Sequence, residues 1–213
     1  MNNEIAYVDN CRSKLEISMK QLISSIGRVP IGKDGQIPYG WRKAAKGRTV
    51  WRLLEEIISQ NLELHASDLG MQDFEPAPSE VGVYDFSFHY DETSRIYVNV
   101  KSALKGGRTN KDDISKAFQL NDFMSSVASC VLLVASVEID FLENPLCIEL
   151  SNCYVVPVSW LPDIYVNPSN NGNLQSSKYK NIEEAVPRTC KEFLEILRDE
   201  IGVAERKRAK RQK

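Results

Sequence analysis

Residues 81–101 hold two apolar segments joined by a short polar tract, and this pattern constrains the fold more than any other. The first segment, Val81 to Phe88, mixes β-branched and aromatic residues. The second, Arg95 to Lys101, alternates apolar and polar positions. Period-two alternation of this kind is typical of a half-buried strand. The polar tract from His89 to Ser94 suits a hairpin connection, so the sequence predicts two neighbouring antiparallel strands.

Three polar side chains of this hairpin are expected to meet. Successive side chains of a strand point to opposite faces, so Asn99 and Lys101 share one face, and the hairpin partner can bring Asp85 against them. A hard divalent cation such as Mg²⁺ prefers oxygen ligands and keeps several waters. A lysine beside it can orient the attacking water or offset charge that develops on a phosphate. A cluster of Asp85, Asn99 and Lys101 therefore offers the oxygen ligands and the lysine that a metal-dependent site for phosphate chemistry needs. The alternative is an ordinary hairpin with a solvated polar face.

A helix predicted from Arg48 to Leu64 carries a further carboxylate. Its apolar stripe comprises Trp51, Leu54, Ile58 and Leu62. Glu55 borders this stripe, and a carboxylate aimed toward a core needs a partner. The partner is either a metal site or a basic side chain in an ion pair. Glu138 and Asp140, which alternate in a later strand, form a rival acidic pair, but no lysine follows them at the needed spacing.

The composition indicates a globular protein with a substantial core. The chain has 213 residues, of which 42% are hydrophobic, and this suits one domain better than two. It has no run of about 18 apolar residues and no signal-like N-terminus, so we expect a cytoplasmic protein without a membrane segment. The five cysteines show no CxxC spacing and are predicted to be buried thiols.

The order of elements predicts an α/β fold, with a mixed central β-sheet flanked by helices. The division is residues 1–47 for an N-terminal helix and a basic loop, 48–166 for the catalytic core, and 167–213 for an Asn-rich loop, a C-terminal helix and a basic tail. Within the core we expect a helix from Lys111 to about Ser129, followed by buried strands at Cys130–Phe141 and Cys147–Val158.

Basic and amide-bearing residues outside the predicted site suggest contacts with nucleic acid. The net charge is −2, so only local clusters can serve such a role. Basic side chains suit phosphates, and Asn or Gln amides can bond base edges in the major groove. Solvated loops are the alternative in each case. The candidate DNA-binding residues are Arg42, Lys43, Lys46, Arg48, Lys105, Arg108, Asn170, Asn171, Asn173, Gln175 and Lys178.

The acidic residue on one strand and the N-V-K triplet on the next resemble the site of PD-(D/E)xK nucleases. This superfamily commonly places a glutamate on a helix just before the first core strand, as at Glu55. The run G-x-x-V-x-x-x-L-E from Gly47 to Glu55, the dipeptide Asn167-Pro168, and R-T-x-x-E-F from Arg188 to Phe193 are similar to a blunt-cutting type II restriction endonuclease. The likeness is patchy and spans about residues 30–200. Asn99 departs from the superfamily, which usually has Asp or Glu there.

The resemblance implies Mg²⁺-dependent, sequence-specific hydrolysis of double-stranded DNA that leaves a 5′-phosphate. It also implies a homodimer, whose two-fold symmetry matches a palindromic site, and a cognate DNA methyltransferase as genetic partner. Catalysis then falls to Asp85, Asn99, Lys101 and Glu55, with Mg²⁺ held by Asp85, Asn99, Val100 and Glu55. The alternatives are a DNA repair or junction-resolving nuclease of the same fold, and a catalytically inactive DNA-binding protein.

Overall fold

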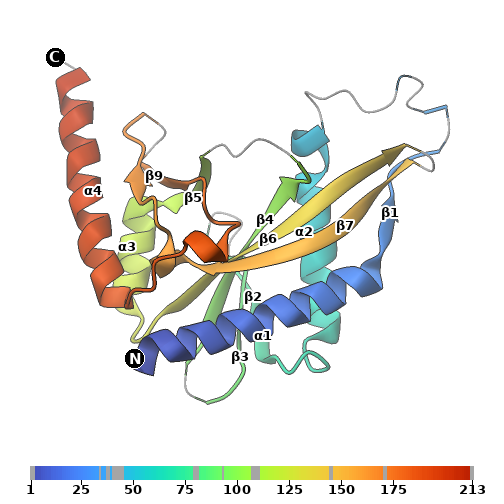
Figure 1. Cartoon of the computed structure of the whole chain (residues 1–213), viewed down its shortest axis with the longest axis horizontal. Helices are drawn as coiled ribbons and strands as arrows, with labels where there is room; N and C mark the ends of the chain where they lie inside the picture. The colour runs from blue at the N-terminus through green and yellow to red at the C-terminus, as the bar shows by residue number, and fades with distance from the viewer. Residues whose placement is uncertain are drawn as a thin grey trace.

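The computed structural model describes residues 3–33, 35–36, 39, 46–78, 82–92, 94–106, 111–143, 146–169 and 172–211. A long, curved six-stranded sheet forms its centre (Figure 1), with the strand order β1-β7-β6-β4-β3-β2. A second sheet has three short strands in the order β5-β9-β8. The predicted α/β class, with a mixed central sheet flanked by helices, is confirmed.

Two helices and an edge strand come before the other strands of the large sheet. Helix α1 (Asn3–Ile26) is followed by strand β1 (Arg28–Pro30), which pairs with β7 at the edge of the sheet. The sequence predicts a basic loop directly after α1. The structure differs there, because the three residues of β1 pair with β7 and form a short strand. Helix α2 (Lys46–His65) then precedes strand β2 (Gln72–Pro76).

The predicted hairpin is confirmed as an antiparallel pair. Strand β3 (Phe86–His89) pairs with β4 (Ile96–Leu104), with Phe86 opposite Val98. Strand β4 in turn runs parallel to β6 (Val131–Glu143), and β6 pairs antiparallel with β7 (Leu146–Pro157). The two buried strands expected after the hairpin are therefore also confirmed.

The segment between β4 and β6 differs from its prediction. Instead of one helix starting at Lys111, it forms strand β5 (Asp112–Lys116) and the shorter helix α3 (Ala117–Ser126). Strand β5 pairs with β9 (Asn173–Ser176), which lies within the predicted Asn-rich loop. The partner strand is distant in the sequence, so the local pattern did not reveal this pairing.

The remaining elements complete the small sheet and one flank of the large one. They are the 3₁₀ turn η1 (Val158–Trp160), strand β8 (Tyr165–Val166), the 3₁₀ turn η2 (Ile182–Glu184) and helix α4 (Cys190–Arg211). Helix α4 begins with a capping box: the Thr189 backbone N–H donates to Glu192 Oε2 at 2.8 Å, and the Glu192 backbone N–H donates to Thr189 Oγ1 at 3.3 Å.

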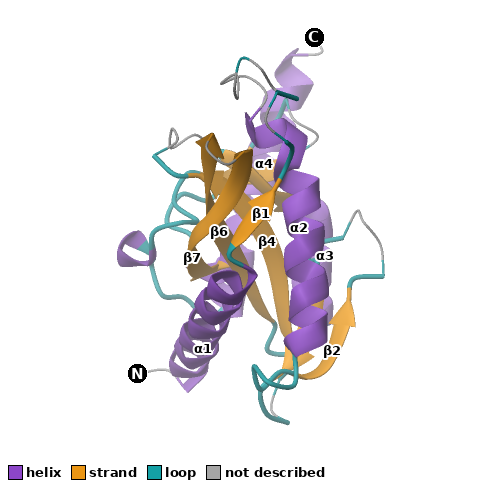
Figure 2. Cartoon of the chain, turned by 90° about the vertical axis from the view of Figure 1, so that its right-hand side faces the viewer, coloured by secondary structure: helices purple, strands orange, loops and turns teal. Residues whose placement is uncertain are grey.

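The core has two parts, one on each face of the large sheet. Helices α1 and α2 cover one face (Figure 2), with α1 mainly against β7 and α2 against β4, through residues such as Leu15 and Leu54. The other face packs against α3 and α4, through residues such as Leu120 and Phe193.

The five cysteines are free thiols and four are buried, as predicted. No helix among the described residues is long and apolar enough to cross a membrane.

Candidate active site

Helix α2 and the strands beneath it form a pocket of about 380 Å³. The helix is fixed on the sheet by Leu54, Ile58 and Leu62, each 0% exposed. Val50 is also buried, whereas the predicted stripe member Trp51 is only half-buried. The pocket is lined by Arg52, Glu55, Glu56 and Ser59 from α2 and by Pro76, Ala77, Asp85 and Val100 from the strand side.

Asp85 is held by both of its neighbouring strands. Its backbone N–H donates to the Val98 carbonyl at 2.8 Å, and its carbonyl accepts from the N–H of Ala77 at 2.8 Å. Its carboxylate Oδ2 accepts from the N–H of Val100 at 2.6 Å. The carboxylate is therefore fixed on β4 at the point where β3 begins, while the residue still borders solvent.

The negative charge of Asp85 acts on the Glu55 carboxyl group in the pocket. Burial raises the pKa of Glu55 to about 7, and the negative charge of Asp85 contributes to this shift, while Lys101 and Arg52 oppose it. Burial likewise raises the pKa of Asp85, against the Val100 hydrogen bond and the charge of Lys101. Burial makes it costly for both carboxyl groups to be ionised at the same time. A bound cation offsets their negative charge, so the pair favours cation binding.

Asn99 and Lys101 lie on β4 beside this pocket. Asn99 is 7% exposed, its Nδ2 donates to the carbonyl of Val83 at 3.1 Å, and its buried Oδ1 has no hydrogen-bond partner among the described residues. Lys101 is half-buried. Lys101 and both carboxyl groups are thus close enough for their charges to interact, whereas the Asn99 amide is held against the segment before β3.

The donor set suits a magnesium ion better than a softer metal. Among the described residues, no group of three or more His, Cys, Asp or Glu side chains is placed to hold a metal. The oxygens available in the pocket lining are the carboxylates of Glu55 and Asp85 and the backbone carbonyl of Val100. Asn99, whose Oδ1 has no partner among the described residues, is next to Val100 on β4 but does not line the pocket. Mg²⁺ is usually held by one or two carboxylates and keeps several waters, so these residues fit it.

Many of the predicted DNA-binding residues fall outside the described part of the chain. Arg42, Lys43, Arg108, Asn170 and Asn171 lie there, as do the side chains of Lys46 and Arg48. These residues remain predictions.

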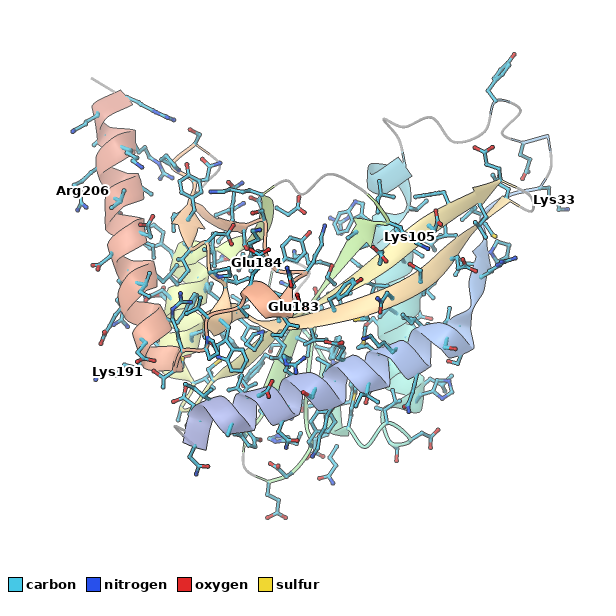
Figure 3. The ribbon with its side chains drawn as sticks, viewed as in Figure 1. Lys33, Lys105, Glu183, Glu184, Lys191 and Arg206 are labelled. Carbon is cyan, nitrogen blue, oxygen red and sulfur yellow. The ribbon has the colours of Figure 1, made fainter. Side chains whose placement is uncertain are left out.

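The other four predicted DNA-binding residues are placed. Lys105 is exposed at the end of β4 (Figure 3). Lys178 forms an ion pair with Glu184 at 2.6 Å. Asn173 and Gln175 face outward from β9, and both amides donate to other side chains. Of these four residues, Lys105 has the side chain that is most accessible to a phosphate.

Arg52 is a pocket residue that its helical spacing alone would place on the wet face of α2. It packs over the Trp51 ring, with its guanidinium carbon 4.6 Å from the ring centre. It lines the pocket three residues before Glu55, and its charge lowers the pKa of Glu55. The one-turn spacing of Arg52 and Glu55 was the available signal.

The rival residues Glu138 and Asp140 lie on β6 and do not line this pocket.

Comparison with known proteins bears on the fold. No protein-family model matches the sequence, and no curated protein matches it. Among solved structures the chain is similar to the NlaIV restriction endonuclease, with 12% sequence identity and a TM-score of 0.51. The match covers 95% of this chain and 89% of that one. At this identity the likeness shows a shared fold, so the expected restriction-endonuclease-like fold is confirmed.

Proposed function

We propose that this protein is a type II restriction endonuclease that hydrolyses double-stranded DNA with Mg²⁺. The observation that carries the proposal is the pocket in which Glu55 and Asp85 meet within reach of the charge of Lys101. The same pocket lies in a fold similar to that of the NlaIV restriction endonuclease. The helix carrying Glu55 directly precedes β2, as the resemblance to PD-(D/E)xK nucleases implies.

Each residue has a chemical role in this proposal. Asp85, Glu55, the Val100 carbonyl and Asn99 hold Mg²⁺. When bound, the ion supplies positive charge for the phosphate and eases deprotonation of a water. Lys101 offsets negative charge on the reacting phosphate and orients the attacking water. Arg52 steadies Glu55 in its ionised form.

The same proposal includes the DNA contacts, the oligomeric state and the genetic partner. Arg42, Lys43, Lys46, Arg48, Lys105 and Arg108 contact phosphates, and the amide-rich segment reads bases. The enzyme acts as a homodimer on a palindromic site. A cognate methyltransferase is its genetic partner, because a sequence-specific DNA nuclease kills an unprotected host.

The test is cleavage of supercoiled plasmid DNA across a range of Mg²⁺ concentrations. We expect discrete fragments with the wild type and none with Asp85→Ala or Lys101→Ala, although both variants still bind DNA. Glu55→Gln should be nearly as damaging. Glu63→Gln is the matched control, since Glu63 is exposed on the same helix and lies outside the pocket lining.

Other outcomes separate the alternatives. Wild-type cutting by Asp85→Ala would remove this site from the mechanism. Nicking without discrete fragments, or cutting of branched DNA alone, would favour a repair or junction-resolving nuclease. DNA binding without metal-stimulated cleavage would favour an inactive DNA-binding protein.

A further inference from the structure

The solvent-facing side of the small sheet carries a row of polar and aromatic side chains. Along β9, Leu174 and Ser176 are buried, whereas Asn173 and Gln175 lie on the other side of the strand and are partly exposed. Asn173 Oδ1 is itself buried and has no hydrogen-bond partner among the described residues. Gln175 lies opposite Asp113 of β5 on one side and opposite Tyr165 of β8 on the other. We call these four outward residues, Asp113, Tyr165, Asn173 and Gln175, the polar sheet face.

Hydrogen bonds fix the orientation of both amides on this face. Asn173 Nδ2 donates to Asp113 Oδ2 at 2.9 Å, and Gln175 Nε2 donates to Asp113 Oδ1 at 2.7 Å. Asn167 Nδ2, just after β8, donates to Gln175 Oε1 at 3.1 Å. An amide that is free to rotate can present either its oxygen or its nitrogen. Here Asp113 holds both NH₂ groups toward itself.

Basic side chains lie at the edges of this face. Arg208 of α4 donates to the Pro168 carbonyl at 3.2 Å, and Arg211 donates to the Ser169 hydroxyl. The basic last turn of α4 therefore lies against the turn between β8 and β9. Lys111 lies over the Tyr165 ring at 4.3 Å. These positive charges flank the polar sheet face, where they can contact phosphates on either side of a groove.

The polar sheet face is also connected to the candidate active site. Strand β4, which carries Lys101, ends at Leu104, and β5 begins at Asp112. In Figure 1 the small sheet and α2 lie on either side of the carboxyl end of β4.

We propose that the polar sheet face reads a base pair in the major groove and that Asp113 determines which pair is accepted. This inference rests on the proposed function, to which it adds a specificity residue. The Asp113 carboxylate is an acceptor placed between two NH₂ groups, each of which keeps a second hydrogen to donate. An A·T pair presents the complementary order in the major groove: adenine N7 accepts, adenine N6 donates and thymine O4 accepts. The order for G·C differs, with two acceptors on guanine and the donor on cytosine. The face therefore favours A·T.

The experiment selects bound sequences from a library of randomised DNA duplexes, in a buffer that contains Ca²⁺ in place of Mg²⁺. Wild type and Asp113→Asn are compared, with Asp122→Asn as the control, because Asp122 is an exposed carboxylate on α3 and is not part of the small sheet. We expect the wild type and Asp122→Asn to enrich one motif. Asp113→Asn should lose the preference at an A·T position, with tenfold to about hundredfold weaker discrimination there. Its affinity for random duplexes should not fall, because the change removes a negative charge near the phosphates.

The outcomes keep this inference separate from the proposed function. If Asp113→Asn enriches the same motif with the same discrimination, the inference is wrong, even if the protein cleaves DNA. If the wild type enriches no motif, the inference is also wrong, and unspecific metal-dependent cutting can still occur. A uniform loss of affinity on all duplexes would overturn the inference and assign Asp113 to folding of the small sheet, which circular dichroism of the variant would confirm. Loss of plasmid cleavage by Asp85→Ala tests the nuclease site alone.

Discussion

The carboxylate of Asp85 accepts a hydrogen bond from the backbone N–H of Val100 at 2.6 Å. Nearby, the amide of Asn99 donates to the carbonyl of Val83 at 3.1 Å. Strand β3 begins only at Phe86, so these two side chains satisfy backbone groups of β4 and of the segment before β3. The hydrogen bonds at the end of the strand pair therefore also fix the two hairpin side chains proposed to hold the metal.

This arrangement separates structural and catalytic effects at Asp85. Asp85→Asn keeps an oxygen that can accept from Val100 but removes the negative charge. Asp85→Ala leaves the N–H unsatisfied, which costs about 1–3 kcal/mol. We expect both variants to lose cleavage, while only Asp85→Ala unfolds at a clearly lower urea concentration. Equal stability of the two variants would show that the Val100 hydrogen bond contributes nothing to folding.

The raised pKa of Glu55 predicts a pH-dependent stability. Burial and the charge of Asp85 raise the pKa from its ordinary value of 4.5 to about 7, so the folded state binds this proton more tightly than the unfolded state. The free energy of unfolding should therefore decrease as the pH rises from about 4.5 to about 7. Urea unfolding at pH 5 and pH 8, without divalent cations, measures this decrease.

Glu55→Gln should weaken that dependence, because the neutral amide has no proton to lose, while Asp85, whose pKa burial also raises, keeps its own contribution. Glu63→Gln should keep the wild-type slope. Adding Mg²⁺ at pH 8 should restore stability to the wild type but not to Glu55→Gln. If Glu55→Gln keeps the full pH dependence, Glu55 is not the group responsible.

The strands that carry the site could be predicted because their signals are local. Residues 96–101 alternate in a way that is typical of a half-buried strand, and β6 and β7 are long and apolar. Glu55 could be placed beside the core because Leu54 and Ile58 set the rotation of α2. In each case the pattern of neighbouring residues was enough to predict the element or the position of the side chain relative to the core.

The small sheet could not be predicted because its strands have distant partners. The five residues of β5 become a strand through β9, about 60 positions later. In the sequence, Asp113 resembles an ordinary solvated carboxylate, and Asn173 and Gln175 resemble loop residues. Their roles depend on one another: the carboxylate orients two amides only once β5 and β9 pair. No local pattern carries that information.

The basic residues just before and at the start of α2 are expected to affect the salt dependence of DNA binding. If Arg42, Lys43 and Lys46 bind phosphates, their joint replacement by Ala should flatten the salt dependence of DNA binding by about 0.9 log–log units for each phosphate that is no longer neutralised. Lys191→Ala, at an exposed position near the start of α4, should leave the slope unchanged (Figure 3). Fluorescence anisotropy with a labelled duplex at several salt concentrations measures the slopes. An unchanged slope in the triple variant would exclude this segment from the interface.

Asn99→Asp tests whether the amide is a metal ligand or a structural hydrogen-bond donor. The change replaces an NH₂ that donates to the Val83 carbonyl with a second oxygen and buries a carboxyl group. Without metal we expect the free energy of unfolding to fall by about 1–3 kcal/mol. If Oδ1 binds Mg²⁺, the added charge should lower the Mg²⁺ concentration needed for cleavage, and Mg²⁺ should recover part of the stability. Titration of plasmid cleavage and of urea unfolding with Mg²⁺ measures both. A variant that is less stable and less active at every Mg²⁺ concentration would show that Asn99 serves the fold through Val83 and does not bind the ion.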